Sequence, residues 1–272
     1  MTRARLVAVL VLAVALAGLG LLTLVDRSVA EVEPVPAAVE ADVTAPERAP
    51  AATPARTLTP IPHQMRGVET AAERRLRLLQ EIEARMVWKQ SRTLGTHNAG
   101  SLVDGVRLPR EGVHFLTWDA VRWRAPNAED RRYGSDRLVR LLLGVVAEYR
   151  AANPGAPRVM IGDLSRPEGG SFDSRYGIVG EFGAGRGTLG HVSHQNGLDV
   201  DVYYPRRDGR ERAPDSLGDI DLSLAQDLVD RFVAAGAQFV FVGPRTGLTG
   251  PAAVVQPLVR HDDHLHVRLR SP

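Results

Sequence analysis

The chain contains no cysteine, and this absence excludes both disulfide bonds and thiolate chemistry. Lysine is nearly absent as well, because Lys89 is the only lysine among 34 basic residues. These are balanced by 32 acidic residues, which leaves a net charge of +2. The arginines are interleaved with the acids and form no basic stripe, so the sequence predicts no nucleic-acid partner. Any metal site must therefore be built from histidine and carboxylate side chains.

The N-terminal segment contains a long run without charge. Arg3 and Arg5 precede residues 6–25, which are predominantly apolar and numerous enough to span a bilayer as a helix. Basic residues ahead of such a run favour a cytoplasmic N-terminus and export of the remainder, into the periplasm or cell envelope. Because residues 28–30 (Ser-Val-Ala) resemble a signal-peptidase site, we expect residues 1–30 to be either a removed signal peptide or an anchor in the inner membrane.

Two further segments precede the main domain. Residues 31–68 are rich in proline, alanine, threonine and glutamate and have no periodic apolar face, which predicts a disordered spacer. Residues 69–90 carry apolar side chains at helical spacing between charged residues, which predicts an amphipathic helix. The apolar positions are Leu76, Leu79, Ile82 and Met86. Two arrangements are open for this helix, packing on the domain or a projecting stalk.

Residues 91–272 are expected to form one main domain. Ser135 is placed to cap a helix over residues 136–152, and a second amphipathic helix is predicted over 219–236. Alternating or continuous apolar runs predict strands at 158–165, 198–203, 237–243 and 264–270. These elements together predict an α+β domain that has a mostly antiparallel sheet, flanking helices and long loops.

A glycine-rich segment, residues 166–190, interrupts this pattern. Its composition predicts a flexible, irregular loop. The glycine spacing resembles a phosphate-binding loop only superficially, because no strand leads directly into it and no lysine follows it. A nucleotide site is therefore disfavoured here.

Histidine is concentrated in two short stretches of the sequence. Five of the eight histidines lie within residues 190–205 and 261–270, namely His191, His194, His261, His264 and His266. Side chains in a strand alternate between the two faces of the sheet. The strand 198–203 would therefore place Asp199 and Asp201 on one face, and the C-terminal strand would place its histidines on one face.

Carboxylates and imidazoles that share one cavity are costly to bury unless a cation compensates them. Zinc suits nitrogen and oxygen donors without thiolate, and a catalytic zinc takes three protein ligands and keeps one position for water. Each of the short motifs alone is more often an ordinary surface or core feature. Their occurrence together predicts a zinc site, although strand geometry leaves open whether His264 or His266 is the ligand.

The motif His-x6-Asp, followed far downstream by His-x-His, resembles the peptidoglycan-cleaving zinc peptidases of the lysostaphin and D-Ala-D-Ala metallopeptidase group. Within that group, "SHQNGLDVD" (193–201) and "HDDHLHVRLR" (261–270) are similar to the penicillin-insensitive murein endopeptidase family. Further similarity lies in "GTHNAGSLVDGVRLP" (95–109), "RRYG" (131–134) and "IGDLSRPEGG" (161–170). The resemblance covers about residues 92–272.

The resemblance implies roles for the clustered residues. The implied zinc ligands are His194, Asp201 and His266, with His191 as an accessory ligand or a partner of one. His264 is implied to be the catalytic histidine that does not bind the metal, and His261 to be a second active-site histidine. Asp199 would orient a ligand imidazole, or be structural.

The implied activity is a zinc-dependent murein endopeptidase that hydrolyses peptide cross-links of peptidoglycan through a metal-activated water. Arg166 is a candidate for binding a substrate carboxylate, and Tyr203 and Tyr204 for contacting substrate, although an exposed loop arginine and packed tyrosines are the simpler expectations. Two alternatives remain open. One is a D,D-carboxypeptidase or dipeptidase acting on uncross-linked stem peptides, and the other is a non-catalytic, zinc-stabilised cell-wall binding module.

Overall fold

The computed structural model describes residues 69–172, 182 and 191–272. The predicted signal or anchor, the predicted spacer and most of the predicted glycine-rich loop lie outside the described residues. Within the described part of the chain, no helix combines the length and the apolar character that crossing a bilayer requires.

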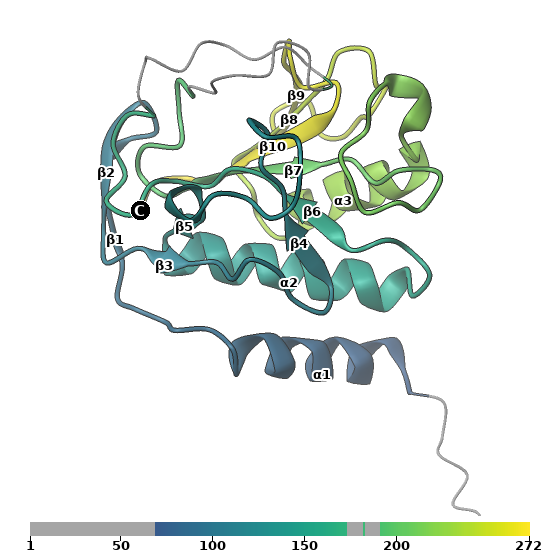
Figure 1. Ribbon diagram of the computed structural model, residues 1–272, viewed down its shortest axis with the longest axis horizontal. Helices are drawn as coiled ribbons and strands as arrows, with labels where there is room; N and C mark the ends of the chain where they lie inside the picture. The colour runs from purple at the N-terminus through teal and green to yellow at the C-terminus, as the bar shows by residue number, and fades with distance from the viewer. Residues whose placement is uncertain (1–68, 173–181, 183–190) are drawn as a thin grey trace, which may run out of the picture. The chain divides into compact units, whose positions relative to one another are not determined.

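A six-stranded mixed sheet forms the centre of the domain, in the order β4-β6-β7-β10-β8-β9 (Figure 1). The strands are β4 (Phe115–Thr117), β6 (Val159–Ile161), β7 (Asp199–Tyr203), β8 (Phe239–Val242), β9 (Val255–Pro257) and β10 (His264–Arg268). The inner pairs are antiparallel, whereas β4 pairs with β6 and β8 with β9 in parallel. The predicted α+β class and the four predicted strands are confirmed, and β4 and β9 are the sheet strands that the sequence patterns did not reveal.

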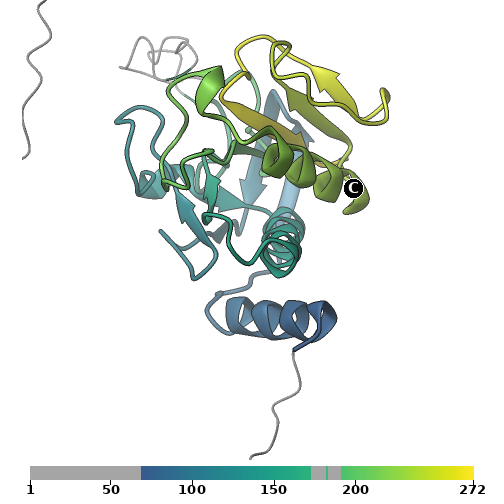
Figure 2. The same ribbon diagram turned by 90° about the vertical axis from the view of Figure 1, so that its right-hand side faces the viewer.

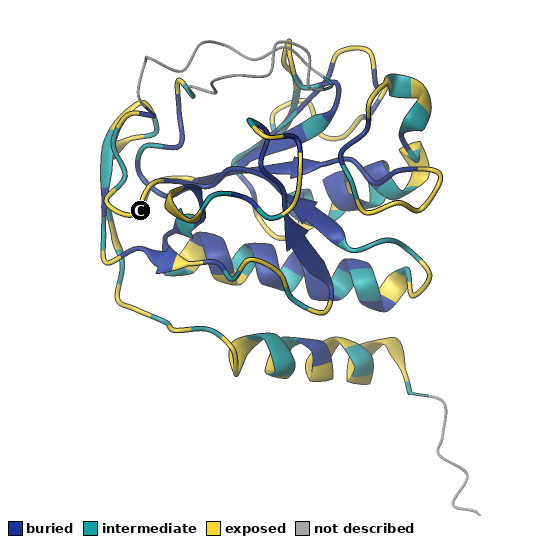
Figure 3. Ribbon diagram, viewed as in Figure 1, coloured by how far each residue is buried: buried dark blue, intermediate teal, exposed yellow. Residues whose placement is uncertain are grey.

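Two helices cover the apolar face of this sheet. Helix α2 (Asp136–Ala152) begins where the Ser135 side chain accepts a hydrogen bond from the Leu138 N–H, and α3 (Leu222–Ala234) is capped by Asp221. The buried strand residues that pack with them in one cluster include Val200, Val202, Leu265 and Val267. The sheet and the inner faces of the helices are accordingly buried (Figure 3).

Helix α1 (Ala71–Glu83) packs on α2, so that α2 lies between α1 and the sheet (Figure 2). It begins at a capping box in which Thr70 and Glu73 bond to each other's backbone N–H groups. The helix is shorter than predicted, and of its predicted apolar positions Ile82 and Met86 pack against the core whereas Leu76 does not. Leu78 is 2% exposed, whereas Leu76, one of the predicted apolar positions, is 59% exposed. Besides Leu78, polar contacts hold α1 on α2, because Arg74 donates to the Ala151 carbonyl and Arg75 pairs with Glu148.

Two small strand pairs and two short helical turns complete the described structure. The hairpin β1 (Arg92–Thr96) and β2 (Ala99–Val103) is largely exposed, and β3 (Val106–Arg107) pairs with β5 (Tyr133–Gly134). The turns are η1 (Glu129–Arg131) and η3 (Leu217–Asp219). The hairpin contacts the loop that carries His191 and His194. The Gln195 N–H of that loop donates a hydrogen bond to the His97 carbonyl, in the hairpin turn, at 3.0 Å.

Candidate metal centre and active site

The antiparallel pairing of β7 with β10 joins the two histidine-rich stretches. Its register sets Asp201 opposite His266 and His264 opposite Tyr203. Residues directly opposite each other in an antiparallel pair project from the same face of the sheet. The polar positions of both strands therefore meet on the face opposite the apolar core, as the alternation in the sequence predicted.

His194 reaches this face from the loop before β7. It is fully buried and has a φ of +69°, a backbone conformation that few residues other than glycine adopt. Its Nδ1 lies 2.8 Å from the Leu164 carbonyl oxygen, to which the ring N–H donates. Nε2 is then left with a free electron pair, and it lies 3.4 Å from Asp201 Oδ1.

Asp201 and His266 complete the centre of the cluster. His266 Nδ1 lies 3.3 Å from Asp201 Oδ1, while its Nε2 lies 2.8 Å from Asp199 Oδ1. Arg268 also donates to Asp199 Oδ1, at 2.7 Å. Asp199 therefore has two donors, and it fixes the orientation of the His266 ring, which was one of the two roles considered for this residue.

The charges at this centre are incompletely balanced. Burial disfavours ionisation of Asp201, but the neighbouring imidazoles of His194, His266 and His264 hold its pKa well below the ordinary value. Burial also lowers the pKa of His194 and keeps that ring neutral. For His266, burial is outweighed by Asp199 and Asp201, which raise its pKa to about 9. The carboxylates thus attract positive charge, which a cation can provide in place of a proton.

Two of the ligand separations at this centre are those of a tetrahedral zinc site. Zinc bonds of about 2.0–2.1 Å to nitrogen and oxygen imply separations between ligand atoms of roughly 3.3–3.4 Å in a regular tetrahedron. Asp201 Oδ1 lies at these separations from His194 Nε2 and His266 Nδ1. Within the described ranges, His194 Nε2 and Asp201 Oδ1 are buried without a hydrogen-bond partner. Such unpaired buried atoms are rare in proteins and are typical of an ion-binding site.

His191 lies beside this centre, and ligand atoms of His191, His194 and Asp201 all lie within 4.8 Å of one another. Its Nε2 is 2.8 Å from Asp163 Oδ2 but 3.8 Å from Asp201 Oδ2. Asp163 is buried and also accepts hydrogen bonds from Arg131 and Asn127. Since Asp163 already engages Nε2, that nitrogen is less suited to bind a metal than the nitrogen of His194 or His266.

His264 lies at the exposed side of the cluster. Its Nδ1 is 2.7 Å from Asp263 Oδ1, and its Nε2 faces Asp201 Oδ1 at 3.9 Å. Burial lowers the pKa of His264, but the charge and hydrogen bond of Asp263 outweigh burial and raise it above the ordinary value. The ring of His261 lies 4.7 Å from that of His264, and burial together with His264 and His266 lowers the pKa of His261 to about 3.

The other candidates from the sequence take ordinary structural positions. Arg166 is exposed and donates to the Ser171 carbonyl at 3.3 Å. The ring of Tyr203 packs between Trp123, at 5.9 Å, and His264, at 5.5 Å, at the edge of the site. Tyr204 is fully buried, and its hydroxyl donates to the His261 carbonyl.

Sequence reasoning missed the two aspartates that hold His191 and His264. Asp263 directly precedes His264, and that adjacency was an available signal. Asp163 follows the buried strand β6 within "IGDLS", where a carboxylate at the end of an apolar run is a weaker indication.

Residues 93–223 match the family model for penicillin-insensitive murein endopeptidases. The chain is related to the penicillin-insensitive murein endopeptidases. This confirms the resemblance predicted from the histidine motifs. A penicillin-insensitive murein endopeptidase of Escherichia coli O157:H7 is 26% identical over 213 residues, which cover 67% of each chain. That of Pectobacterium atrosepticum is 27% identical over 220 residues, covering 71% of this chain and 69% of the relative.

The family match includes His191, His194 and Asp201 but ends before the C-terminal histidines. The structure adds His261, His264 and His266 to the same cluster through the pairing of β10 with β7. The peptidase family is thus supported by sequence comparison, and the composition of the site by geometry.

Proposed function

We propose that this protein is a zinc-dependent murein endopeptidase that hydrolyses the peptide cross-links of peptidoglycan. The observation that carries the proposal is the approach of His194 Nε2 and His266 Nδ1 to the same oxygen, Asp201 Oδ1, at 3.4 and 3.3 Å, in a chain similar to murein endopeptidases. These three residues would hold the metal. The chemistry supplied by bound zinc is activation of a water molecule and polarisation of the scissile carbonyl.

Two hydrogen bonds prepare the ligand imidazoles. The Leu164 carbonyl accepts from His194 Nδ1, and Asp199 accepts from His266 Nε2. Each bond holds the ring proton on the nitrogen that faces away from Asp201, so the opposite nitrogen presents its electron pair. His191, held by Asp163, is assigned a place beside the three ligands rather than among them.

His264 is assigned the proton-transfer role. Asp263 holds a proton on Nδ1, so Nε2 faces the site and can accept a proton from water and pass it to the leaving amine. The ring of His261 lies beside that of His264, tilted by 37°, and its lowered pKa keeps it neutral at pH 7. A neutral His261 adds no further positive charge to the neighbouring ring and could accept a substrate hydrogen bond through Nε2.

The substrate places the enzyme outside the cytoplasm, in the periplasm or cell envelope. The apolar run at residues 6–25 is consistent with export, either as a signal peptide or as an inner-membrane anchor. Residues 31–68 would then separate the peptidase domain from the membrane.

The decisive experiment incubates the full-length protein with purified cross-linked muropeptide dimers, with and without a chelator. We expect dimers to yield monomers with new amine ends, chelation to stop the reaction and added zinc to restore it. Release of terminal D-alanine without cleavage of dimers would instead identify a carboxypeptidase. Binding to peptidoglycan without any product would identify a binding module.

Two variants separate metal binding from proton transfer in the same assay. His266→Ala is expected to lose both zinc and hydrolysis. His264→Ala is expected to retain one zinc per chain and to lose hydrolysis by a factor of about 100 to 10,000. Full activity of either variant would contradict the assigned role.

A further inference from the structure

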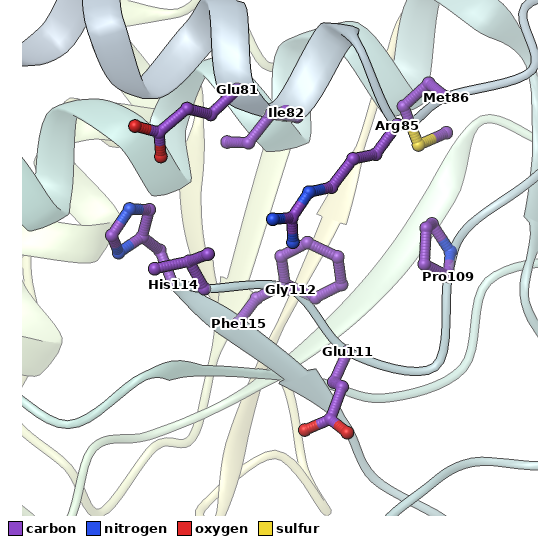
Figure 4. Close-up of a pocket in the computed structure, with 10 residues that line it drawn as sticks. Glu81, Ile82, Arg85, Met86, Pro109, Glu111, Gly112, His114 and Phe115 are labelled. Carbon is purple, nitrogen blue, oxygen red and sulfur yellow. The ribbon is translucent and has the colours of Figure 1, made fainter.

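A cavity of about 150 Å³ lies beneath α1, with Met86 and Phe115 in its wall (Figure 4). His114 also lines it, but both of its ring nitrogens are buried, so His114 offers an occupant no hydrogen bond there. The turn that follows β8, by contrast, contacts a segment that carries two groups of the proposed active site. These groups are His261 and Asp263.

The segment 261–263 (His-Asp-Asp) leads into β10, and Tyr204 fixes it at both ends. The Tyr204 hydroxyl donates to the His261 carbonyl at 3.2 Å, and the Tyr204 main-chain N–H donates to the Asp263 carbonyl at 3.2 Å. The Gly243 N–H, in the turn after β8, donates to the same hydroxyl at 3.4 Å. These hydrogen bonds set the path of the segment before it enters β10.

The middle residue of this segment, Asp262, is held from the side by Arg245. Asp262 is 1% exposed, and its Oδ1 accepts from the Arg245 main-chain N–H at 3.1 Å while its Oδ2 pairs with the Arg245 guanidinium. Gly243 lies so close that a Cβ at that position would come within 2.2 Å of Asp262 Oδ1. Because a buried carboxylate is costly without a paired cation, the ion pair holds Asp262 against the turn after β8.

The two neighbours of Asp262 are the groups that the proposed reaction uses. The ring of His261 lies 4.7 Å from that of His264, and Asp263 Oδ1 lies 2.7 Å from His264 Nδ1. A shift of Asp262 would therefore displace His261 on one side and Asp263, together with the His264 ring, on the other. The three proposed zinc ligands lie outside this segment.

We propose that Arg245 and Asp262 are positioning residues, whose ion pair holds the segment 261–263 so that the rings of His261 and His264 face the reacting groups. This inference rests on the proposed function. A misplacement of about 1 Å can lower the rate of an enzyme about 100-fold. Loss of the pair therefore lowers kcat, whereas zinc binding is left to residues that the pair does not touch.

The first test replaces Arg245 in the full-length protein. Arg245→Gln removes the guanidinium and keeps the main-chain N–H. We expect kcat on muropeptide dimers to fall about 10- to 100-fold, with KM within about twofold of the parent and one zinc retained per chain. A parental kcat, or loss of zinc together with activity, would overturn the proposal.

Arg231→Gln is the matched control, because it breaks an Arg–Asp pair of 2.8 Å on α3. Its kcat is expected to equal that of the parent. A general loss of stability would lower kcat in both arginine variants, so an equal fall in the control would also overturn the proposal.

Asp262→Asn tests the pair from its other side. The double variant, Asp262→Asn with Arg245→Gln, leaves no buried charge unpaired, so it is expected to fold even if Arg245→Gln does not. Residues that act as a unit give losses that do not add, so the double variant should match Asp262→Asn in kcat. Losses that multiply, or a double variant with parental kcat, would contradict a shared positioning role.

Histidine ring signals in NMR spectra of the full-length protein give a readout that does not require hydrolysis. In Arg245→Gln the signals of His261 and His264 are expected to shift, while those of His194 keep their positions. Absence of hydrolysis by the parent would contradict the proposed function. Unchanged signals of His261 and His264 would instead contradict the positioning role, so the two failures are distinguishable.

Discussion

Buried histidine occurs both on the polar face of β7 and β10 and beneath α1, and the surroundings differ sharply. At the first place His194 and His266 each have one ring nitrogen fixed by a hydrogen bond and the other directed at Asp201. At the second place neither nitrogen of His114 has a hydrogen-bond partner among the residues that the structure describes. The comparison teaches that burial alone does not make an imidazole a metal ligand, because the ring must also be oriented and face a carboxylate.

The largest expected loss of zinc and of hydrolysis follows from substituting Asp201. Asp201→Asn removes the negative charge that His194 and His266 face, so we expect loss of bound zinc and a fall in dimer hydrolysis of at least about 1,000-fold. Metal content after dialysis and product release by chromatography are the measurements. A variant that kept its zinc would show that Asp201 is not a ligand.

A smaller effect is expected from the residue that orients His266. Asp199→Asn weakens the hydrogen bond to Nε2, and loss of such a partner lowers metal affinity by about 10- to 100-fold. Competition with a chelator of known affinity measures the change. Arg268→Gln is the control, since it removes the other donor to Asp199 and leaves the bond to His266 in place. If Asp199→Asn and Arg268→Gln bound zinc equally tightly, the hydrogen bond from His266 to Asp199 would not be what sets the zinc affinity.

Beneath α1 we expect a substitution of the buried histidine to stabilise the protein, whereas the substitutions at the metal centre impair it. His114→Phe replaces an imidazole with two unpartnered nitrogens by an apolar ring, so the free energy of unfolding should rise by about 1 kcal/mol. Thermal unfolding at pH 7 tests this, with hydrolysis expected to equal that of the parent. Destabilisation would mean that the nitrogens of His114 have partners, such as bound water, that the substitution removes.

An effect on stability of similar size concerns the segment that connects α1 to the domain. Asp136 accepts hydrogen bonds from the Lys89 and Ser91 N–H groups. Burial raises its pKa, but these hydrogen bonds outweigh burial and lower it below the usual 3.8. A carboxyl with a depressed pKa stabilises the fold above the unfolded-state pKa and loses this contribution as the pH falls through its folded-state value.

We therefore expect Asp136→Ala to reduce the free energy of unfolding by about 0.5–1.5 kcal/mol at pH 7. The difference from the parent should shrink as the pH falls below about 4, which denaturant titrations at several pH values would detect. A difference that stayed constant with pH would mean that the charge of Asp136 is not involved.

Much of the fold was predictable where capping residues and the spacing of apolar residues are enough to determine the secondary structure. The cap at Ser135, the helix after it and the alternation in β7 all follow from local rules, and the structure confirms them. The apolar face of α1 was predicted less well, because Leu76 and Leu78 are close in sequence and only packing on α2 decides which one is buried. The two-residue strands β3 and β5 are too short for any periodic signal.

By itself the sequence determined that any metal site here must use histidine and carboxylate, and that residues 190–205 and 261–270 were where to look for it. It also indicated the similarity to the penicillin-insensitive murein endopeptidases, which the family match over residues 93–223 supports. Only the tertiary structure decided which atoms converge, because the register of β7 against β10 sets His266 rather than His264 opposite Asp201. That register depends on contacts between segments more than sixty residues apart, which local patterns do not encode. The same is true of Asp163, Asp263 and the cavity under α1, whose surroundings exist only after the chain has folded.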